Sequence, residues 1–115
     1  MLSTMQINQP EESNMSATVR MSEDKKTVTI SVSGRFDFSL HNEFRKTYKD
    51  VADSGIQYIL DLKTTEYMDS SALGMLLMLK EHADKNASKI KVSNISADIR
   101  DILTIASFDK LFVLE

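Results

Sequence analysis

Hydrophobic and polar residues alternate in two early segments of the chain, 16–21 and 27–33. In the second segment, TVTISVS, Val28, Ile30 and Val32 point to one side, and threonine and serine point to the other. This period of two is typical of a half-buried strand. The run between the segments, SEDKK, is polar and predicts a turn, so we expect the two strands to form an antiparallel hairpin.

The period changes after Gly34, which ends the second strand. From residue 39 the apolar residues recur every three or four positions, which predicts a helix, and Ser54-Gly55 predicts its end. The residues on the apolar face are Leu40, Phe44, Tyr48 and Val51. The next segment, 56–62, reads as a strand, IQYILDL, and a loop from Lys63 to Met68 follows it.

The segment from Ala72 to Ala83 is apolar around much of its circumference, which predicts a helix packed on more than one side. We expect its methionines, Met75 and Met78, to fill the core. A turn over 86–88 and an alternating strand over 89–93, KIKVS, come next. Ser96 is expected to cap a last helix, and the segment 111–114, LFVL, to close the sheet as a short strand.

The predicted order is therefore β-β-α-β-α-β-α-β in a single α/β domain. Strands that alternate with helices favour a mixed, mostly parallel sheet, opened here by the antiparallel hairpin, with the helices packed on the sheet. Residues 1–14 are polar, hold the only proline and lack apolar periodicity, so they are predicted to be a flexible N-terminal tail before a domain over 15–115.

The amino-acid composition excludes several classes of function. The 115 residues include no cysteine and two histidines, which excludes disulfides and cysteine nucleophiles and leaves no expected metal site or cofactor. The net charge of −3 disfavours nucleic acid as a partner. The longest apolar run, from Met75 to Leu79, is too short for membrane insertion, and the N-terminus lacks the features of a secretory signal. We therefore expect a cytoplasmic protein.

One segment, YMDSSALG over 67–74, lies between the end of a buried strand and the start of a buried helix. Partners of open α/β sheets usually bind at the carboxyl ends of the strands. Asp69, Ser70 and Ser71 are good helix N-cap residues, and capping is the favoured interpretation from spacing alone. A hydroxyl at this position would also lie beside unpaired N–H groups, where the fold would tolerate a phosphate.

The segment ILDLKTTEYMDSSALGML, which ends at Leu76, closely resembles the central motif of STAS domains, a family that includes the bacterial anti-sigma-factor antagonists. Gly34-Arg35-Phe36-Asp37 stands where the family has a G-x-x-D turn, and Leu111-Phe112 follows the last helix as the family's closing strand does. The resemblance runs from about Ser16 to Glu115.

The resemblance implies that Ser70, directly after the aspartate, is the serine that a partner kinase phosphorylates. Ser71 is a second candidate, although capping is the favoured interpretation for it. The partner is then expected to be an anti-sigma factor or a GHKL-type serine kinase, and a PP2C-type phosphatase would restore the serine. The expected partner-binding residues are Asp37, Asp69, Ser70, Ser71, Ala72 and Gly74.

In this scheme Asp37 contacts the partner, and Asp69 shapes the loop that carries the phosphate acceptor. The alternative that Asp37 is only a turn residue after Gly34 remains open. The chain departs from the family at Arg35, where Glu or Lys is frequent, and at Ser107, where Gly is frequent. Arg35 could alter the choice of partner, and Ser107 makes the helix end less sharply defined.

Two other functions compete with a phosphorylation-gated switch. A constitutive STAS subunit of a larger lipid-transport or stress-sensing assembly would keep the fold and change the role. An enzyme is disfavoured, because the chain has neither a G-x-S-x-G elbow nor a P-loop glycine run. We expect the free protein to be a monomer.

Overall fold

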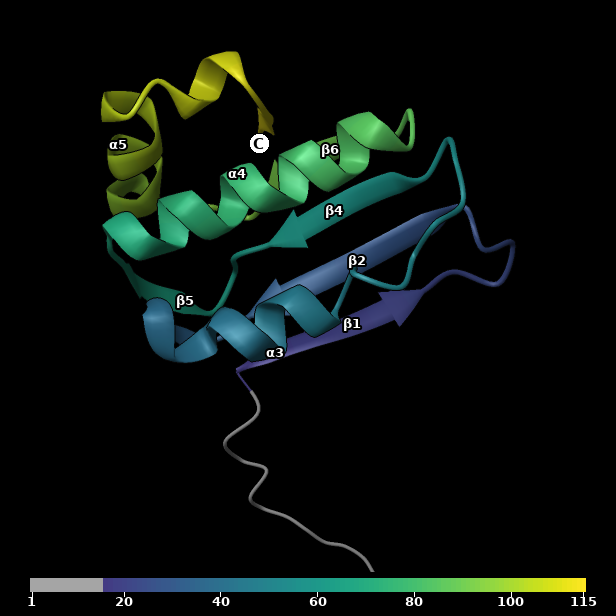
Figure 1. The fold of residues 1–115 in the computed structure, drawn as a ribbon. Helices are drawn as coiled ribbons and strands as arrows, with labels where there is room; N and C mark the ends of the chain where they lie inside the picture. The colour runs from purple at the N-terminus through teal and green to yellow at the C-terminus, as the bar shows by residue number, and fades with distance from the viewer. Residues whose placement is uncertain (1–15) are drawn as a thin grey trace, which may run out of the picture.

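The computed structural model describes residues 16–115, which form a five-stranded sheet, helices on one of its faces and a two-stranded ladder at one end (Figure 1). The tail predicted over 1–14 lies outside the described residues. In chain order the elements are β1 (Ala17–Met21), β2 (Thr27–Val32), β3 (Gly34–Phe36), η1 (Phe38–Leu40), α3 (His41–Lys46), β4 (Gln57–Asp61), β5 (Thr65–Met68), α4 (Ser70–Lys85), β6 (Lys89–Ser93), α5 (Ala97–Ile105), η2 (Phe108–Lys110) and β7 (Val113–Leu114).

The large sheet has the strand order β1-β2-β4-β6-β7. Strands β1 and β2 form an antiparallel hairpin, and every other neighbouring pair is parallel. One row of the register joins Ile30, Leu60 and Val92, each fully buried. The mixed, mostly parallel sheet predicted from the alternating pattern is confirmed.

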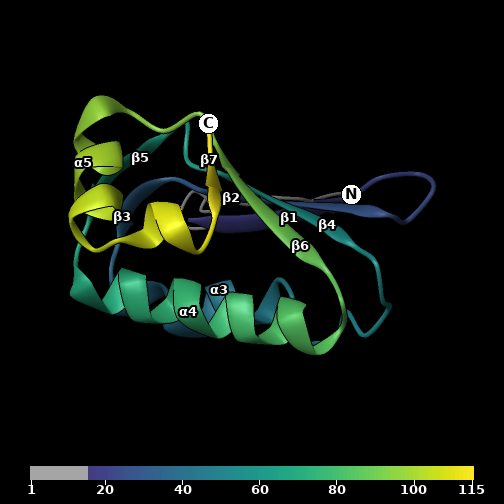
Figure 2. The same ribbon diagram turned by 90° about the horizontal axis from the view of Figure 1, so that it is seen from above.

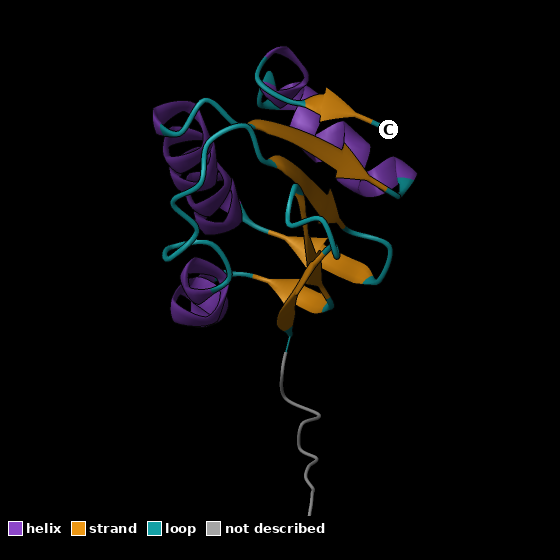
Figure 3. Cartoon of the chain, turned by 90° about the vertical axis from the view of Figure 1, so that its right-hand side faces the viewer, coloured by secondary structure: helices purple, strands orange, loops and turns teal. Residues whose placement is uncertain are grey.

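Helices α3 and α4 lie side by side on one face of this sheet, and α5 lies at the end where β3 and β5 are found (Figure 2). The inward residues of the central strands are buried beneath these helices, whereas outward residues such as Thr29, Ile59 and Lys91 are partly exposed. Figure 3 shows the same layers from the side. The core therefore lies between the sheet and one helical layer.

Helix α4 departs from the prediction that it packs on more than one side. Its buried residues, which include Met75 and Leu76, share the face toward the sheet. Leu77 and Met78 are 46% and 44% exposed, so the placement of Met78 in the core was wrong and that of Met75 was right. The described domain has a single helical layer, so nothing within residues 16–115 covers the other side of α4.

The loop predicted from Lys63 to Met68 contains a strand. Within it β5 pairs in parallel with β3, the segment that follows Gly34. Gly34 has φ +75°, and its N–H donates to the carbonyl of Thr64 at 2.9 Å, so the chain leaves β2 and immediately meets the β5 region. Strands as short as β3 and β5 show no regular alternation of apolar and polar residues, so the sequence does not identify them as strands.

Two element ends also differ from the prediction. Helix α3 ends at Lys46, and turns carry the chain from there to Gly55, which has the left-handed φ of +73° expected of it. Ser107 also has a left-handed φ, +65°, and stands between α5 and η2. The closing strand begins at Val113 and not at Leu111, because the N–H groups of Leu111 and Phe112 both donate to the Phe108 carbonyl in the turn that follows η2.

Candidate functional site

The β3–β5 ladder brings together two loops that are distant in sequence. Phe36 and Met68 are paired at the ends of the two parallel strands. The next residue on each strand is an aspartate, Asp37 on one and Asp69 on the other, and the Asp69 N–H donates to the Phe36 carbonyl at 3.4 Å. The two aspartates predicted from the motifs are therefore neighbours at one edge of the fold.

Each aspartate forms the same turn with a serine two residues later. Asp69 Oδ1 accepts hydrogen bonds from the Ser71 N–H at 3.0 Å, the Ser71 hydroxyl at 2.6 Å and the Ala72 N–H at 3.1 Å, and so caps α4. Asp37 Oδ1 accepts from the N–H of Ser39 at 3.0 Å and also from its hydroxyl. We call residues 37–39 and 69–71 the two D-x-S turns.

The middle residue of each D-x-S turn projects outward. Phe38 is 69% exposed and Ser70 is exposed as well. The Ser71 hydroxyl is engaged with Asp69, whereas the Ser70 hydroxyl makes no hydrogen bond with any residue from 16 to 115. Of the two candidate acceptors, Ser70 thus has the accessible oxygen and Ser71 belongs to the cap.

Hydrogen bonds stabilise the charge of both aspartates. The Ser71 hydroxyl, helped by the N–H groups of Ala72 and Ser71, lowers the pKa of Asp69 from its ordinary value of 3.8, although desolvation and, to a smaller extent, the charge of Asp37 act in the opposite direction. The Ser39 hydroxyl and N–H lower the pKa of Asp37 in the same way. Ser70 is therefore accompanied by two carboxylates that stay ionised at neutral pH.

Arg35 and Tyr67 are paired in the β3–β5 ladder and extend this surface. The Arg35 guanidinium lies 4.4 Å from the centre of the Tyr67 ring, and its Nε is 3.4 Å from Asp37 Oδ2. Tyr67 is 43% exposed. Neither Phe38 nor Tyr67 was identified from the sequence, although the repeated D-x-S spacing could have directed attention to Phe38.

The other two residues proposed from the motif have different settings. Ala72 lies on the buried face of α4 and is fully buried, so it offers no surface to a partner. Gly74 is exposed one turn after Ser70, and no atom lies within 4 Å of the position that a Cβ would take there. The fold itself gives no reason for a glycine in the middle of this helix.

Helix α4 presents one continuous exposed face that starts at the candidate acceptor. At about 100° per residue, Ser70, Gly74, Leu77 and Glu81 fall within one narrow sector of the helix. All four are exposed, and Met78 lies beside them at 44% exposure. We call these five residues the α4 stripe.

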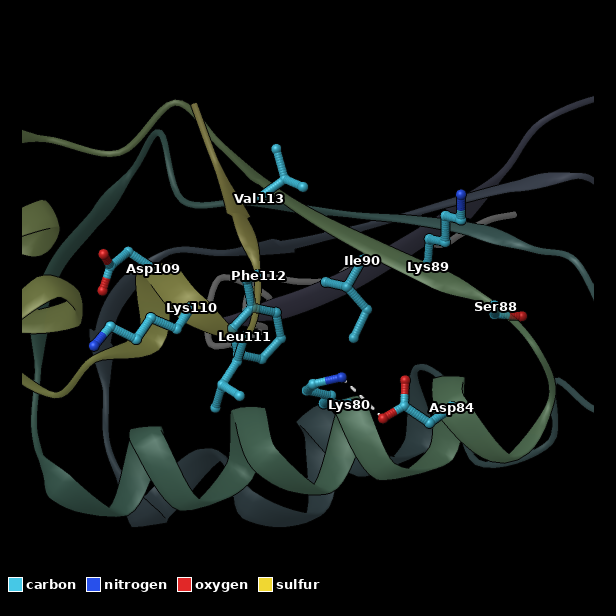
Figure 4. A pocket seen from close by; sticks show the side chains of 10 residues that line it. All are labelled: Lys80, Asp84, Ser88, Lys89, Ile90, Asp109, Lys110, Leu111, Phe112 and Val113. Carbon is cyan, nitrogen blue, oxygen red and sulfur yellow. Dashed lines mark hydrogen bonds and ion pairs between the residues drawn. The ribbon is translucent and has the colours of Figure 1, made fainter.

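A pocket of about 390 Å³ lies against the other end of α4, between that helix, β6 and the C-terminal segment (Figure 4). Lys80 and Asp84 form an ion pair of 2.8 Å on the α4 side of the pocket, and the side chains of Lys89 and Lys110 point away from it. None of its lining residues belongs to the D-x-S turns or the α4 stripe. Ser70 therefore lies on an open surface and outside this pocket.

Other kinds of site find little support in the described part of the chain. Residues 16–115 contain no group of three or more His, Cys, Asp or Glu side chains that could hold a metal ion. Among the helices of that region, none has the length and apolar character needed to cross a membrane.

Comparison with known proteins identifies the family. The family model described as "Mlab, STAS domain" matches residues 19–115, so the chain belongs to the STAS domain family. The STAS-domain containing protein PA14_20770 of Pseudomonas aeruginosa (strain UCBPP-PA14) is 44% identical over 98 residues, which cover 85% of this chain and 97% of that protein.

Solved structures share the fold at lower identity. An anti-sigma factor antagonist from Mycobacterium paratuberculosis has a TM-score of 0.67 at 23% identity, over 88% of this chain and 86% of that one. The anti-sigma factor antagonist SpoIIAA has a TM-score of 0.64 in its unphosphorylated form, at 17% identity over 86% of each chain. The phosphorylated form of the Bacillus protein scores 0.61 at 16% identity, over 86% of this chain and 90% of that one.

Proposed function

We propose that this protein is a phosphorylation-gated binding domain, an anti-sigma-factor antagonist that holds its partner while Ser70 is bare and releases it when Ser70 is phosphorylated. The observation that carries the proposal is the exposed, unbonded hydroxyl of Ser70 at the start of α4. Solved relatives of the same fold include an anti-sigma factor antagonist in both unphosphorylated and phosphorylated forms, which supports the assignment.

The partner in this proposal is an anti-sigma factor or a GHKL-type serine kinase, and a PP2C-type phosphatase returns Ser70 to its bare form. The docking surface comprises the two D-x-S turns and the α4 stripe. Exposed apolar side chains at Phe38, Leu77 and Met78 would supply buried area in the complex. The absence of a side chain at Gly74 would let the backbone of the partner approach α4 closely.

Charge explains the release. A phosphate adds about 1.5 to 2 negative charges at neutral pH, here on the same surface as the ionised carboxylates of Asp37 and Asp69. Burying this charge against an apolar or acidic surface of the partner costs on the order of several kcal/mol. The N–H groups at the start of α4 would keep the phosphate compatible with the free domain, so phosphorylation changes binding and leaves the fold intact. The domain itself performs no catalysis in this scheme, and it acts in the cytoplasm.

A constitutive STAS subunit of a larger assembly is the second candidate. Leu77 and Met78 favour it, because a permanent partner would keep these two exposed side chains covered. Size-exclusion chromatography of cell lysate separates the two candidates: a small complex supports the switch, and a persistently large one supports the subunit.

Phosphopeptide mapping tests the switch. After incubation with ATP and the cognate kinase, wild-type protein should carry phosphate on the peptide containing Ser70, and Ser70→Ala should carry none. Ser70→Ala should bind the partner and resist release, whereas Ser70→Asp and Ser70→Glu should bind more weakly. Phosphate on Ser71, or equal binding by the Ala and Asp variants, would rule the switch out.

A further inference from the structure

Strand β1 forms one edge of the described sheet, and half of its backbone groups have no hydrogen-bond partner within residues 16–115. At its two ends, the Ser33 N–H donates to the Ser16 carbonyl at 2.8 Å and the Ser22 N–H donates to the Thr27 carbonyl at 2.9 Å. Hydrogen-bonded pairs alternate along an antiparallel ladder. The N–H and C=O groups of the odd-numbered residues, Ala17, Val19 and Met21, therefore point away from β2 along an open edge.

The side chains of the same three residues face the helical side of the sheet, because they pair with the buried residues Val32, Ile30 and Val28 of β2. Val19 and Met21 are nevertheless 49% and 41% exposed. Natural edge strands are usually protected by prolines, by inward-pointing charges or by being very short. The opposite edge, β7, has only two residues, whereas β1 has five and carries no charge on its inward face.

A largely apolar groove runs along this edge. It has a volume of about 440 Å³ and lies between β1 and α3. Its lining residues are Ala17, Thr18, Val19, Glu43, Lys46 and Thr47. The Ser16 N–H donates to Glu43 Oε2 at 3.4 Å, which holds the start of the strand against α3 while the groove beside it stays open.

We propose that a second copy of this chain occupies the edge, with the two β1 strands antiparallel across a two-fold axis at Val19. In this register Val19 faces its own counterpart, and Ala17 faces the Met21 of the second copy. All three odd-numbered residues of each strand would then hydrogen-bond across the interface. This proposal differs from the monomer expected from the sequence, and the experiments below decide between the two.

The sequence of β1 favours this register over its neighbours. Centring the axis on Arg20 would place two arginines directly opposite each other, which is destabilising. Centring it on Thr18 would leave Met21 without a partner residue in β1 of the second copy. With the axis at Val19, Arg20 faces Thr18 on the outer side of the sheet. On the inner side the smallest residue, Ala17, faces the longest, Met21, whose side chain would enter the groove beside Ala17.

The pairing has a consequence for the whole assembly. Paired residues of antiparallel strands point to the same face, so both helical layers would lie on one side of a continuous ten-stranded sheet. The interface involves β1 and the edge of α3 and leaves α4 free. Two copies of Ser70 would therefore face the same side, which permits bivalent contact with a dimeric partner.

Sedimentation equilibrium on the full chain, without any partner, tests the dimer independently of the switch. The interface is small, so we expect the average mass to rise from 13.0 kDa toward twice that value over about 10 µM to 1 mM protein. Val19→Lys should raise the dissociation constant at least about tenfold, because it places like charges opposite each other. Val113→Lys, at a valine of similar exposure (58%) on the opposite edge, should leave it unchanged.

The lack of cysteines in the chain permits a test of the register. Under mild oxidation Val19→Cys should form a disulfide-linked dimer, because hydrogen-bonded partners across the axis would have Cα atoms about 5.5 Å apart. Val113→Cys should stay reduced. A monomer at every concentration would overturn the proposal. This holds whether the edge is then covered by another segment, such as residues 1–15, or by nothing. Equal behaviour of the two cysteine variants, or of the two lysine variants, would overturn it as well.

Discussion

At the scale of single residues, the site depends on one arrangement used twice. Asp37 and Asp69 each bind the serine two positions later, and in both turns the intervening side chain is turned outward. The two turns differ in the intervening residue: one presents an aromatic ring at Phe38 and the other a hydroxyl at Ser70. The aspartates position these groups and contribute negative charge to the surface.

Asp69→Ala tests the cap of α4. Its loss leaves two N–H groups and the Ser71 hydroxyl without their acceptor, so the melting temperature should fall by several degrees at pH 7. Because folding lowers the pKa of Asp69, its stabilising effect is present above pH 3.8 and is lost as the pH falls through the lower folded value. The difference in melting temperature between the two proteins should therefore shrink in acid.

Ser70→Ala is the matched control for this measurement, since it removes a neighbouring hydroxyl that makes no hydrogen bond within residues 16–115. It should melt close to the wild type at every pH. An equal loss of stability in both variants would mean that Asp69 does not cap the helix.

At the scale of elements, helix α4 divides its apolar residues between two tasks. One face packs on the sheet through residues such as Leu76 and Leu79, both fully buried. The opposite face carries the α4 stripe, with two half-exposed apolar side chains and a glycine that the fold does not need. Within residues 16–115, a helix with apolar residues on both sides is thus packed on one side only.

Leu76→Ala should lower the free energy of unfolding by about 2–5 kcal/mol, because it opens a cavity beneath α4. Lys80→Ala removes only a surface ion pair with Asp84 and should cost less than about 0.5 kcal/mol. Urea denaturation of the two variants measures both values. Similar losses would mean that Leu76 does not face the core.

Gly74→Ala separates stability from binding. Alanine is favoured over glycine within a helix by about 0.5–1 kcal/mol, and the site is free of neighbouring atoms, so the variant should be more stable than the wild type. Partner binding by the same variant should be weaker, because the new methyl group holds the partner away from α4. Thermal melting and titration calorimetry test the two effects, and a variant that gains stability and binds normally would remove Gly74 from the docking surface.

At the scale of the whole molecule, the described fold uses one face of the sheet for its core and one end for its site. The two strands that bring the D-x-S turns together, β3 and β5, form a ladder separate from the large sheet. The edge strand β1 and the stripe on α4 are different surfaces of the same helical side, so the proposed association between copies would not block the proposed binding of a partner.

Deletion of residues 1–14 should leave both surfaces unchanged. These residues are polar and lack apolar periodicity, and the first strand of the described residues begins at Ala17. Differential scanning fluorimetry should give the same melting temperature with and without them, and partner binding should be preserved. Limited proteolysis should trim the chain up to about Met15. A fall of many degrees on truncation would show that the segment is part of the folded structure.

The sequence by itself determined the elements whose information is local. Strict alternation from Thr27 to Val32 and in Lys89–Ser93 identified β2 and β6, and Ser96 was correctly placed as a cap, since its side chain accepts from the Ile99 N–H at 3.2 Å. The D-S-S-A-L-G motif indicated Ser70 as the candidate phosphate acceptor for the same reason, because the motif consists of consecutive residues.

Only the tertiary structure decided which surfaces remained open. Strand β5 exists because β3, about thirty positions earlier, lies beside it, and no period within either short segment predicts that pairing. The exposure of Leu77 and Met78 depends on how many elements cover α4, and that of Val19 depends on what lies beyond the edge of the sheet. The sequence shows whether a residue is apolar. Whether that residue is buried depends on contacts with distant parts of the chain.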